Sequence, residues 1–290
     1  MNTGTIAGKI LWKLAGKLCW IVLLLLLLYF LLGTRSGQKK WKILRRFRYA
    51  HRGLHRKPDV PENSLAAFRK AVEHGFGAEL DVHLTADKRL AVIHDSSLWR
   101  TCGVPGDVED FTAKELSRFR LEGTEEKIPF LEEVLPLFAG KTPLIVEIKP
   151  AKGNWNELTE ATCAMLDRFP VEYGMESFDP RVLLWLKKHR PDVIRGQLAQ
   201  DFLKEPSGLS GLHRFLLTNL LYNCRTRPDF IAYKFEDRRQ FSLWFCRVFC
   251  RVQEVDWTIR SQKDMERAEA LGNLVIFEGF IPDQKGKRHP

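Results

Sequence analysis

From Arg48 onward, short apolar and β-branched runs alternate with segments of helical periodicity. This alternation is typical of parallel α/β architecture, in which each helix returns the chain to the same end of the sheet. The predicted strands occupy residues 47–51, 78–83, 90–94, 144–149, 171–178, 193–198, 230–235, 252–258 and 274–277. Eight or nine strands in about 240 residues favour a (β/α)8 barrel over an open sheet.

The predicted helices lie between these strands, at residues 64–73, 112–119, 130–138, 157–168, 180–188, 240–250 and 262–270. Two stretches interrupt the alternation, one at residues 95–142 after the third strand and one at residues 201–228. The spacing from Asp81 to His94 is too short for a helical crossover, so this connection is expected to be irregular. Residues 215–222 fit either a buried helix or an exposed apolar loop near a membrane.

The net charge of +10 is confined to one end of the chain. Residues 1–50 hold ten of the 46 lysines and arginines and none of the 36 acidic residues. The remaining 240 residues carry 36 charges of each sign and are therefore neutral. A globular face that binds nucleic acid would need an excess of basic residues, so no nucleic-acid partner is expected.

An unbroken apolar run at residues 18–32 predicts an N-terminal transmembrane helix. Lys17 can extend this span by snorkelling, and Trp12, Trp20 and Tyr29 suit the membrane interfaces. The alternative is a cleaved signal peptide, but the sequence around Gly33 is a poor cleavage site and basic residues follow it. The domains expected are an N-terminal tail and anchor at 1–34, a basic juxtamembrane linker at 35–47 and a barrel domain at 48–290.

The charge distribution predicts the orientation of this anchor. Seven basic residues follow the span within residues 35–48, against three before it. The positive-inside rule therefore places the barrel on the cytoplasmic side of the cell membrane as a single-pass protein. The basic linker is also expected to bind anionic membrane lipid, at about 1 kcal/mol for each basic residue near the leaflet.

Polar residues gather at the ends of the first four predicted strands. Glu79, Asp81 and Glu147 offer hard oxygen ligands for a divalent cation, Mg²⁺ or Ca²⁺. His51 and His94 could act as proton carriers near neutral pH, although a lone histidine is more often a core residue. Two further side chains, Arg52 and Lys149, add positive charge for a phosphate. A metal, two proton carriers and two cations together indicate phosphoester hydrolysis.

Six sequence blocks occur in an order and spacing that resemble the glycerophosphodiester phosphodiesterase family. The blocks are His51-Arg52-Gly53, Pro61-Glu62-Asn63-Ser64, Glu79-Leu80-Asp81, His94-Asp95, Ile128-Pro129-Phe130-Leu131-Glu132-Glu133-Val134 and Glu147-Ile148-Lys149. The resemblance runs from about Tyr49 to Pro150 and continues more loosely to Asp283. One departure is Lys88-Arg89, where the family's turn usually has Asp-Gly; it affects a loop and not the site.

The resemblance implies a TIM barrel with a small insertion after the third strand. It also implies that Glu79, Asp81 and Glu147 bind the metal and that His51 and His94 are catalytic.

Four further residues complete the expected substrate site. The resemblance implies that Arg52 and Lys149 contact phosphate, and that Glu62 supports His51 or the substrate rather than the metal. Trp257 is predicted to line the pocket because it lies near the end of a later strand.

The leading hypothesis is a membrane-anchored phosphodiesterase that hydrolyses glycerophosphodiesters to an alcohol and glycerol 3-phosphate. Its substrate would be a small phosphodiester or a lysophospholipid. One alternative is lysophospholipase D-type hydrolysis of membrane lysophospholipids. The other is a barrel without activity that binds lipid headgroups, which would have no need of paired proton carriers at His51 and His94.

Overall fold

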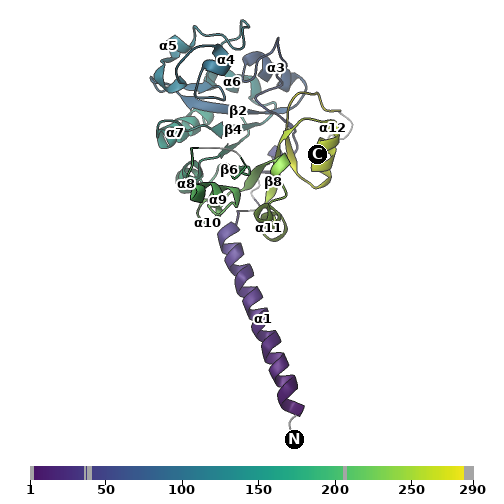
Figure 1. The fold of residues 1–290 in the computed structure, drawn as a ribbon. Coiled ribbons are helices and arrows are strands. Elements are labelled where there is room, and N and C mark those ends of the chain that lie inside the picture. Colours follow the sequence, from purple (N-terminus) through teal and green to yellow (C-terminus); the bar gives the residue numbers. More distant parts are fainter. Residues whose placement is uncertain (1–2, 36, 38–40, 205–207, 284–290) are drawn as a thin grey trace.

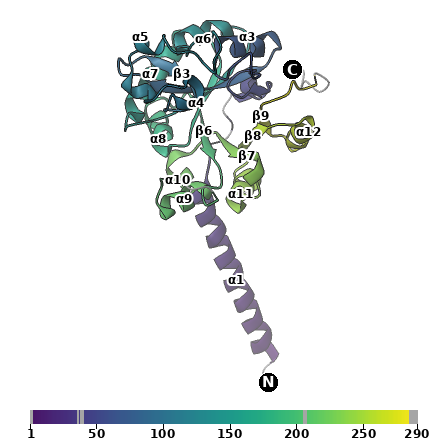
Figure 2. The same cartoon turned by 45° about the horizontal axis from the view of Figure 1, so that its top comes forward.

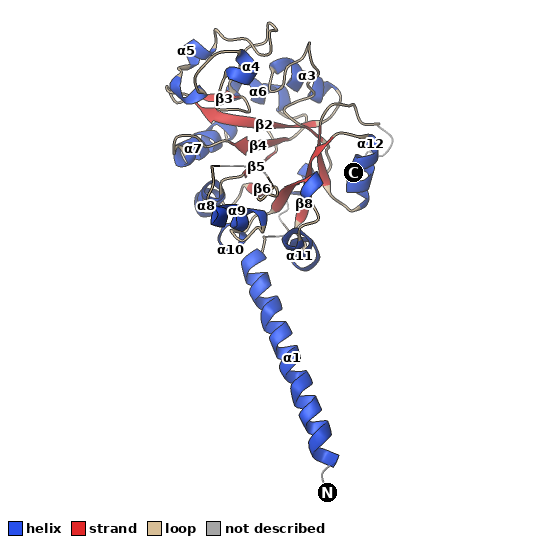
Figure 3. Cartoon of the chain, viewed as in Figure 1, coloured by secondary structure: helices blue, strands red, loops and turns tan. Residues whose placement is uncertain are grey.

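The computed structural model describes residues 3–35, 37, 41–204 and 208–283. Eight parallel strands close into a barrel because β1 (Tyr49–Ala50) pairs with both β2 (Gly77–Leu84) and β9 (Leu274–Phe277). Between β2 and β9, the barrel strands are β4 (Leu144–Ile148), β5 (Tyr173–Ser177), β6 (Ile194–Ala199), β7 (Phe230–Lys234) and β8 (Gln253–Ile259). Figure 3 shows the strands at the centre and helices around them. The predicted (β/α)8 TIM barrel is confirmed.

The third strand in chain order, β3 (Leu90–Val92), lies outside the barrel because it pairs antiparallel with β2. This hairpin is the irregular connection expected between Asp81 and His94. The insertion follows it and contains α4 (Trp99–Cys102), η1 (Val108–Asp110) and α5 (Ala113–Leu116), packed on a small apolar cluster of their own.

The helix predicted at 112–119 is wrong in length, since only Ala113–Leu116 is α-helical. The amides of Arg118 and Phe119 bond to carbonyls three residues back, which forms tight turns instead of a longer helix.

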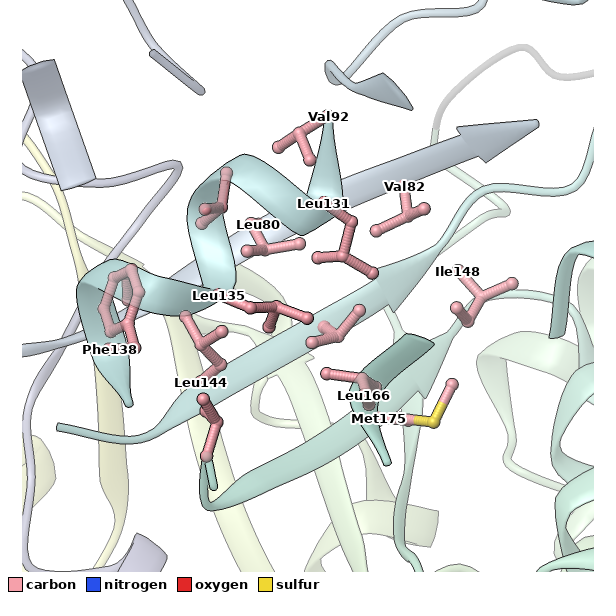
Figure 4. Packing of buried hydrophobic residues seen from close by; sticks show 14 of the residues in the cluster. Leu80, Val82, Val92, Leu131, Leu135, Phe138, Leu144, Ile148, Leu166 and Met175 are labelled. Atoms are coloured by element: carbon pink, nitrogen blue, oxygen red, sulfur yellow. The ribbon is translucent and has the colours of Figure 1, made fainter. Parts of the chain in front are cut away.

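Six helices cover the barrel, and their bounds lie within two residues of the predicted ranges. They are α3 (Leu65–Glu73), α6 (Leu131–Phe138), α7 (Trp155–Leu166), α8 (Pro180–His189), α11 (Phe241–Phe249) and α12 (Gln262–Ala270). Figure 4 shows Leu80 and Val82 of β2 against Leu131 and Leu135 of α6. Because side chains alternate along a strand, residues 79 and 81 then point into the barrel.

Two strands end earlier than predicted, both next to the end of the barrel that carries the polar residues. β1 ends at Ala50 and β3 ends at Val92, so His51 and His94 both lie in the turns that follow. After β1 the chain turns sharply, with Gly53 donating to the carbonyl of Ala50 and Arg52 at a φ of 54°.

The connection from β6 to β7 contains α9 (Gly211–Thr218) and α10 (Asn223–Thr226). For residues 215–222, the sequence allows either a buried helix or an exposed loop. These residues form the partly buried end of α9 and the turn that follows it. Thr218 and Leu220 are buried, whereas Phe215 is exposed.

The amino-terminal end of the barrel is closed by the segment that precedes β1. Leu44 of α2 (Trp41–Leu44) and Tyr49 are buried among the inner side chains of the strands. The Trp41 ring stacks on Phe230 with centroids 4.9 Å apart. The described part of the predicted linker is thus packed on the barrel, while its residues 36 and 38–40, and residues 284–290 of the barrel domain, lie outside the described residues.

The N-terminal helix α1 (Thr3–Leu32) extends away from the barrel in both views (Figures 1 and 2). Its stretch Ile10–Leu32 has 23 residues with a mean hydropathy of 2.4, long and apolar enough to cross a membrane. Only its last turns contact the barrel, where Leu28, Leu31 and Leu32 pack on the cluster around Ile231 and Leu243.

Candidate active site

The barrel strands bring three carboxylates from distant parts of the sequence together. Asp81 of β2 is in register with Glu147 of β4, and Glu79 lies two residues earlier on the same face of β2. Their ligand oxygens lie within 4.8 Å of one another, and all three side chains are buried. A fourth carboxylate, Glu176 of β5, is in register with Glu147 and is also buried.

The electrostatics of this cluster fit a bound divalent cation. Burial raises the pKa of Glu79, and the neighbouring Asp81 and Glu147 raise it further. Burial also raises the pKa of Glu147 to about 7, although Lys149 opposes the shift. Asp81 Oδ1 is buried and has no hydrogen-bond partner. Buried carboxylates that repel one another and keep an oxygen without a hydrogen bond are suited to hold a hard cation.

Asp81 is the member of the cluster whose negative charge is best supported. Burial raises its pKa, but His94, Lys149 and Arg52 outweigh burial and leave the pKa well below its usual range. Asn63 Nδ2 also donates to Asp81 Oδ2 over 2.9 Å. Asp81 therefore remains ionised beside the two carboxylates whose pKa values are raised.

Two cationic side chains border the carboxylates. Lys149 Nζ lies 3.2 Å from Glu147 Oε1 and 3.6 Å from Asp81 Oδ1. Arg52 Nε lies 3.7 Å from Asp81 Oδ2, and its backbone amide donates to Glu79 Oε2 over 2.9 Å. These cations could also face a phosphate oxygen at the mouth of the barrel.

Glu62 holds Arg52 in this position. Its Oε1 accepts from Arg52 over 2.8 Å and from Arg100 over 2.7 Å, and the side chain is buried. Asp95 also pairs with Arg100, so the insertion is tied to the site through this arginine. Glu62 thus positions Arg52, and it would act on a substrate only through that arginine.

Each of the two histidines has a carboxylate on one ring nitrogen. His51 Nδ1 lies 2.5 Å from Glu278 Oε2, and His94 Nδ1 lies 2.6 Å from Asp95 Oδ1. Burial lowers the pKa of His51, with Glu278 acting in the opposite direction. The hydrogen bond from His51 lowers the pKa of Glu278 to about 2. In both rings the carboxylate on Nδ1 fixes the orientation and leaves Nε2 without a hydrogen bond to a described residue, although His51 Nε2 lies 4.0 Å from Glu79 Oε2.

The cavity between these groups has one polar and one apolar side. A space of about 40 Å³ lies between both histidines and the carboxylates of Glu79, Glu147 and Glu176. Its other walls include the apolar residues Phe178, Leu198, Trp257 and Ile276. A wider recess of about 410 Å³ adjoins it and shares His94, Glu147 and Phe178. Trp257 Nε1 is buried without a hydrogen-bond partner, so a donor is available at the wall of the cavity.

All nine residues singled out from the sequence converge on this end of the barrel. Sequence reasoning missed the roles of Glu278, Asp95 and Asn63, which orient His51, His94 and Asp81. Glu278 directly follows the last strand, and its position there is the one signal that pointed to the pocket. Pairing with a histidine more than 200 residues away has no signature in a single sequence.

Comparisons with known proteins agree with this geometry. The model of the glycerophosphoryl diester phosphodiesterase family matches residues 51–202. A glycerophosphodiester phosphodiesterase of Caldanaerobacter subterraneus subsp. tengcongensis is 31% identical over 253 residues, which are 81% of this chain and 92% of that protein. Lysophospholipase D GDPD1 of Rattus norvegicus is 34% identical over 125 residues, 39% of this chain and 38% of the relative.

The fold has solved counterparts as well. The structure of an Oleispira antarctica phosphodiesterase in complex with the product sn-glycerol-3-phosphate superposes with a TM-score of 0.67 at 21% identity. The superposition covers 84% of this chain and 95% of that one. With the family match over more than half of its residues, the chain belongs to the glycerophosphoryl diester phosphodiesterase family and is a phosphoric diester hydrolase.

Proposed function

We propose that the protein hydrolyses glycerophosphodiesters to an alcohol and glycerol 3-phosphate, with a divalent cation, Mg²⁺ or Ca²⁺, held by Glu79, Asp81 and Glu147. The observation that carries this proposal is the carboxylate cluster, whose oxygens lie within 4.8 Å of one another beside two histidines. A barrel that only bound headgroups would not require two histidines that each keep one nitrogen free.

The histidines supply the proton transfers. One Nε2, on His51 or His94, accepts the proton of the attacking hydroxyl, from glycerol or water, as the new P–O bond forms. The other ring donates a proton to the alcohol oxygen as its P–O bond breaks. Attack by water gives glycerol 3-phosphate directly, whereas attack by a glycerol hydroxyl gives a cyclic phosphodiester that a water molecule then opens, with the two rings exchanging roles. The lowered pKa of His51 suits a proton acceptor that is neutral near pH 7.

Fixed positive charge stabilises the phosphate during this exchange. Arg52 and Lys149 face the non-bridging oxygens, and Trp257 Nε1 can donate a further hydrogen bond. A divalent cation held by Glu79, Asp81 and Glu147 would supply further positive charge beside the phosphate. Because these groups are held by ion pairs before substrate arrives, little reorganisation is needed during the reaction.

The experiment that tests the function is hydrolysis of glycerophosphocholine by the full chain. Turnover should disappear in EDTA and return with Mg²⁺ or Ca²⁺, and the ion that restores more activity identifies the preferred metal. Turnover that is unaffected by EDTA would contradict the metal assignment, and no turnover with either ion would contradict the substrate.

Glu278→Gln should lower kcat by about 10- to 100-fold while KM changes little, because the charge that orients His51 is lost. Since Glu278 raises the pKa of His51, the variant should also show a lower pKa for that ring. NMR titration of the histidine resonances measures this shift directly. Glu278→Asp, which keeps the charge, should recover part of kcat; equal losses in both variants would argue for a merely structural role.

A second substrate class, lysophospholipids, is favoured by the apolar side of the cavity. Phe178 contacts Trp257 and Phe202 edge-on, each with centroids 5.7 Å apart. This aromatic row runs from the cavity to the segment after β6, where an acyl chain could lie. The relative named lysophospholipase D supports the same idea.

Phe178→Ala should therefore reduce turnover of lysophosphatidylcholine more than turnover of glycerophosphocholine, which has no acyl chain to contact the ring. Parallel assays of both substrates with the full chain measure the ratio. An equal loss on both substrates would remove Phe178 from acyl-chain binding.

We also propose that α1 remains attached as a membrane anchor, with the barrel in the cytoplasm. The packing of Leu28 and Leu32 on the barrel supports retention, because cleavage after residue 34 would expose that apolar cluster. Arg35 continues the contact through Asp229, at 2.6 Å. Mass spectrometry of the mature protein should find the intact N-terminus, and one near Ser36 would show a cleaved signal peptide instead.

A further inference from the structure

The position at which α1 leaves the barrel fixes where a bilayer would lie. The last turns of α1 pack between α10 and α11, and Cys246 of α11 donates to the carbonyl of Leu32 over 3.3 Å. The apolar stretch Ile10–Leu32 is about 35 Å long at about 1.5 Å per residue, which is close to the roughly 30 Å of a hydrocarbon core. The last turn of the apolar stretch therefore already packs on the barrel, and no spacer separates the two.

The outer face of α11 is apolar, although no part of the described chain covers it. Phe241, Trp244 and Val248 recur at helical spacing on this face, and Phe249 extends it. Their exposed fractions lie between 43% and 58%. Trp244 contacts both Phe241 and Phe249, so the aromatic rings form one continuous surface.

α9 presents a similar surface on the other side of α1. Leu212 and Phe215 are exposed on this helix, and Leu209 is exposed two residues before it begins. Figures 1 and 2 both show α9 and α11 on opposite sides of the upper end of α1. The two apolar faces therefore flank the point at which the helix enters a membrane.

The outer faces of α8 and α12 lack such a group of large apolar side chains. Most of their exposed residues are charged, as in Arg181, Lys187 and Lys188 of α8 and Lys263, Glu266 and Arg267 of α12. A chain that kept its whole barrel in water would be expected to place charged residues on α9 and α11 as well. Single large apolar side chains are exposed elsewhere in the described barrel, such as Trp99 of α4 and Ile281, but α9 and α11 carry groups of them beside α1.

Arginines line a groove next to the apolar face of α11. The groove measures about 1090 Å³, lies between α11 and α12, and is bordered by Arg238, Arg239, Arg247 and Arg267. Three of these arginines pair with carboxylates, whereas Arg239 is exposed and forms no ion pair with a described residue. Positive charge beside aromatic side chains suits the headgroup region of an anionic leaflet.

We propose that the exposed faces of α9 and α11 form a lipid-binding surface that seats the barrel on the bilayer crossed by α1. The aromatic rings of α11 enter the interface to about 5–10 Å, and the arginines of the adjoining groove contact anionic headgroups. This proposal rests on the anchoring of α1 but not on the reaction that the enzyme catalyses. Its occupant is the lipid surface itself.

The test uses the full chain in nanodiscs of phosphatidylcholine and phosphatidylserine at about 3:1, with or without bromine on the upper part of the acyl chains. Subtracting the emission of Trp244→Phe from that of the native chain isolates Trp244. Trp99→Phe is the matched control, because Trp99 is also exposed but lies on α4, far from α1 in both views. Brominated lipid should quench most of the Trp244 emission and leave the Trp99 emission unchanged.

A second variant tests whether the apolar side chains of α11 themselves bind the lipid, or whether Trp244 merely lies close to it. Phe241→Glu combined with Val248→Glu should abolish the quenching of Trp244, while near-UV circular dichroism and the melting temperature verify the fold independently of activity. A chain that floats with liposomes but shows no quenching of Trp244 would overturn the lipid surface and leave the anchor intact. Failure to float would overturn both the lipid-binding surface and the membrane anchor. Two copies of the chain per nanodisc, without quenching of Trp244, would show that a second copy covers this surface instead of lipid.

Discussion

Glu79→Gln should reduce kcat/KM for glycerophosphocholine by at least about 100-fold, because a cation that supplies several kcal/mol loses one ligand charge. The melting temperature of the metal-free protein should change much less than the activity. Burial raises the pKa of Glu79, and repulsion from Asp81 and Glu147 raises it further, so a neutral side chain is tolerated at this position when no cation is bound. The measurements are steady-state kinetics at saturating metal and thermal unfolding in EDTA.

The exposed Glu160 of α7 supplies an isosteric control, since Glu160→Gln changes a charge in solvent and should leave both kinetics and melting unchanged. Full activity of Glu79→Gln would exclude Glu79 as a metal ligand. A large fall in the melting temperature in EDTA would instead show that the carboxylate supports the fold, for example through the amide of Arg52.

The histidine variants His51→Ala and His94→Ala should each lower kcat by about 10²- to 10⁴-fold, the usual contribution of general acid–base catalysis. The double variant should lose less than the product of the two single losses, because both rings serve one proton-transfer sequence. Stopped assays over long times with glycerophosphocholine measure these low rates.

His189→Ala is the control for these variants, because His189 is exposed at the end of α8, outside the cavity. An unchanged kcat in either single variant would remove that histidine from the mechanism. Additive losses in the double variant would indicate that the two rings act in separate steps.

Much of the fold could be predicted because its signals are local. The alternation of β-like and helical runs predicted the barrel, and the boundaries of α12 and β9 agree with the predicted residues. Local patterns failed where long-range pairing decides the structure. β3 has the composition of a barrel strand, yet its short connection to β2 allows only an antiparallel hairpin.

The candidate site divides in the same way. Glu79 and Asp81 could be assigned to one inward face because strand side chains alternate, and the register of β2 with β4 then places Glu147 beside Asp81. By contrast, the partnership of His51 with Glu278 depends on closure of the barrel between its first and last strands. The apolar surface of α11 could not be recognised either, because a buried helix and a lipid-facing helix have similar composition.

The sealed amino-terminal end of the barrel determines how molecules move through the enzyme. Leu44, Tyr49 and Trp41 fill that end, so the diester enters and both products depart through the opening at the carboxyl ends of the strands. The phosphate monoester carries more negative charge than the diester and should therefore leave Arg52 and Lys149 after the alcohol product has departed. Glycerol 3-phosphate should therefore compete directly with incoming substrate, and its accumulation would slow the enzyme before the diester is exhausted.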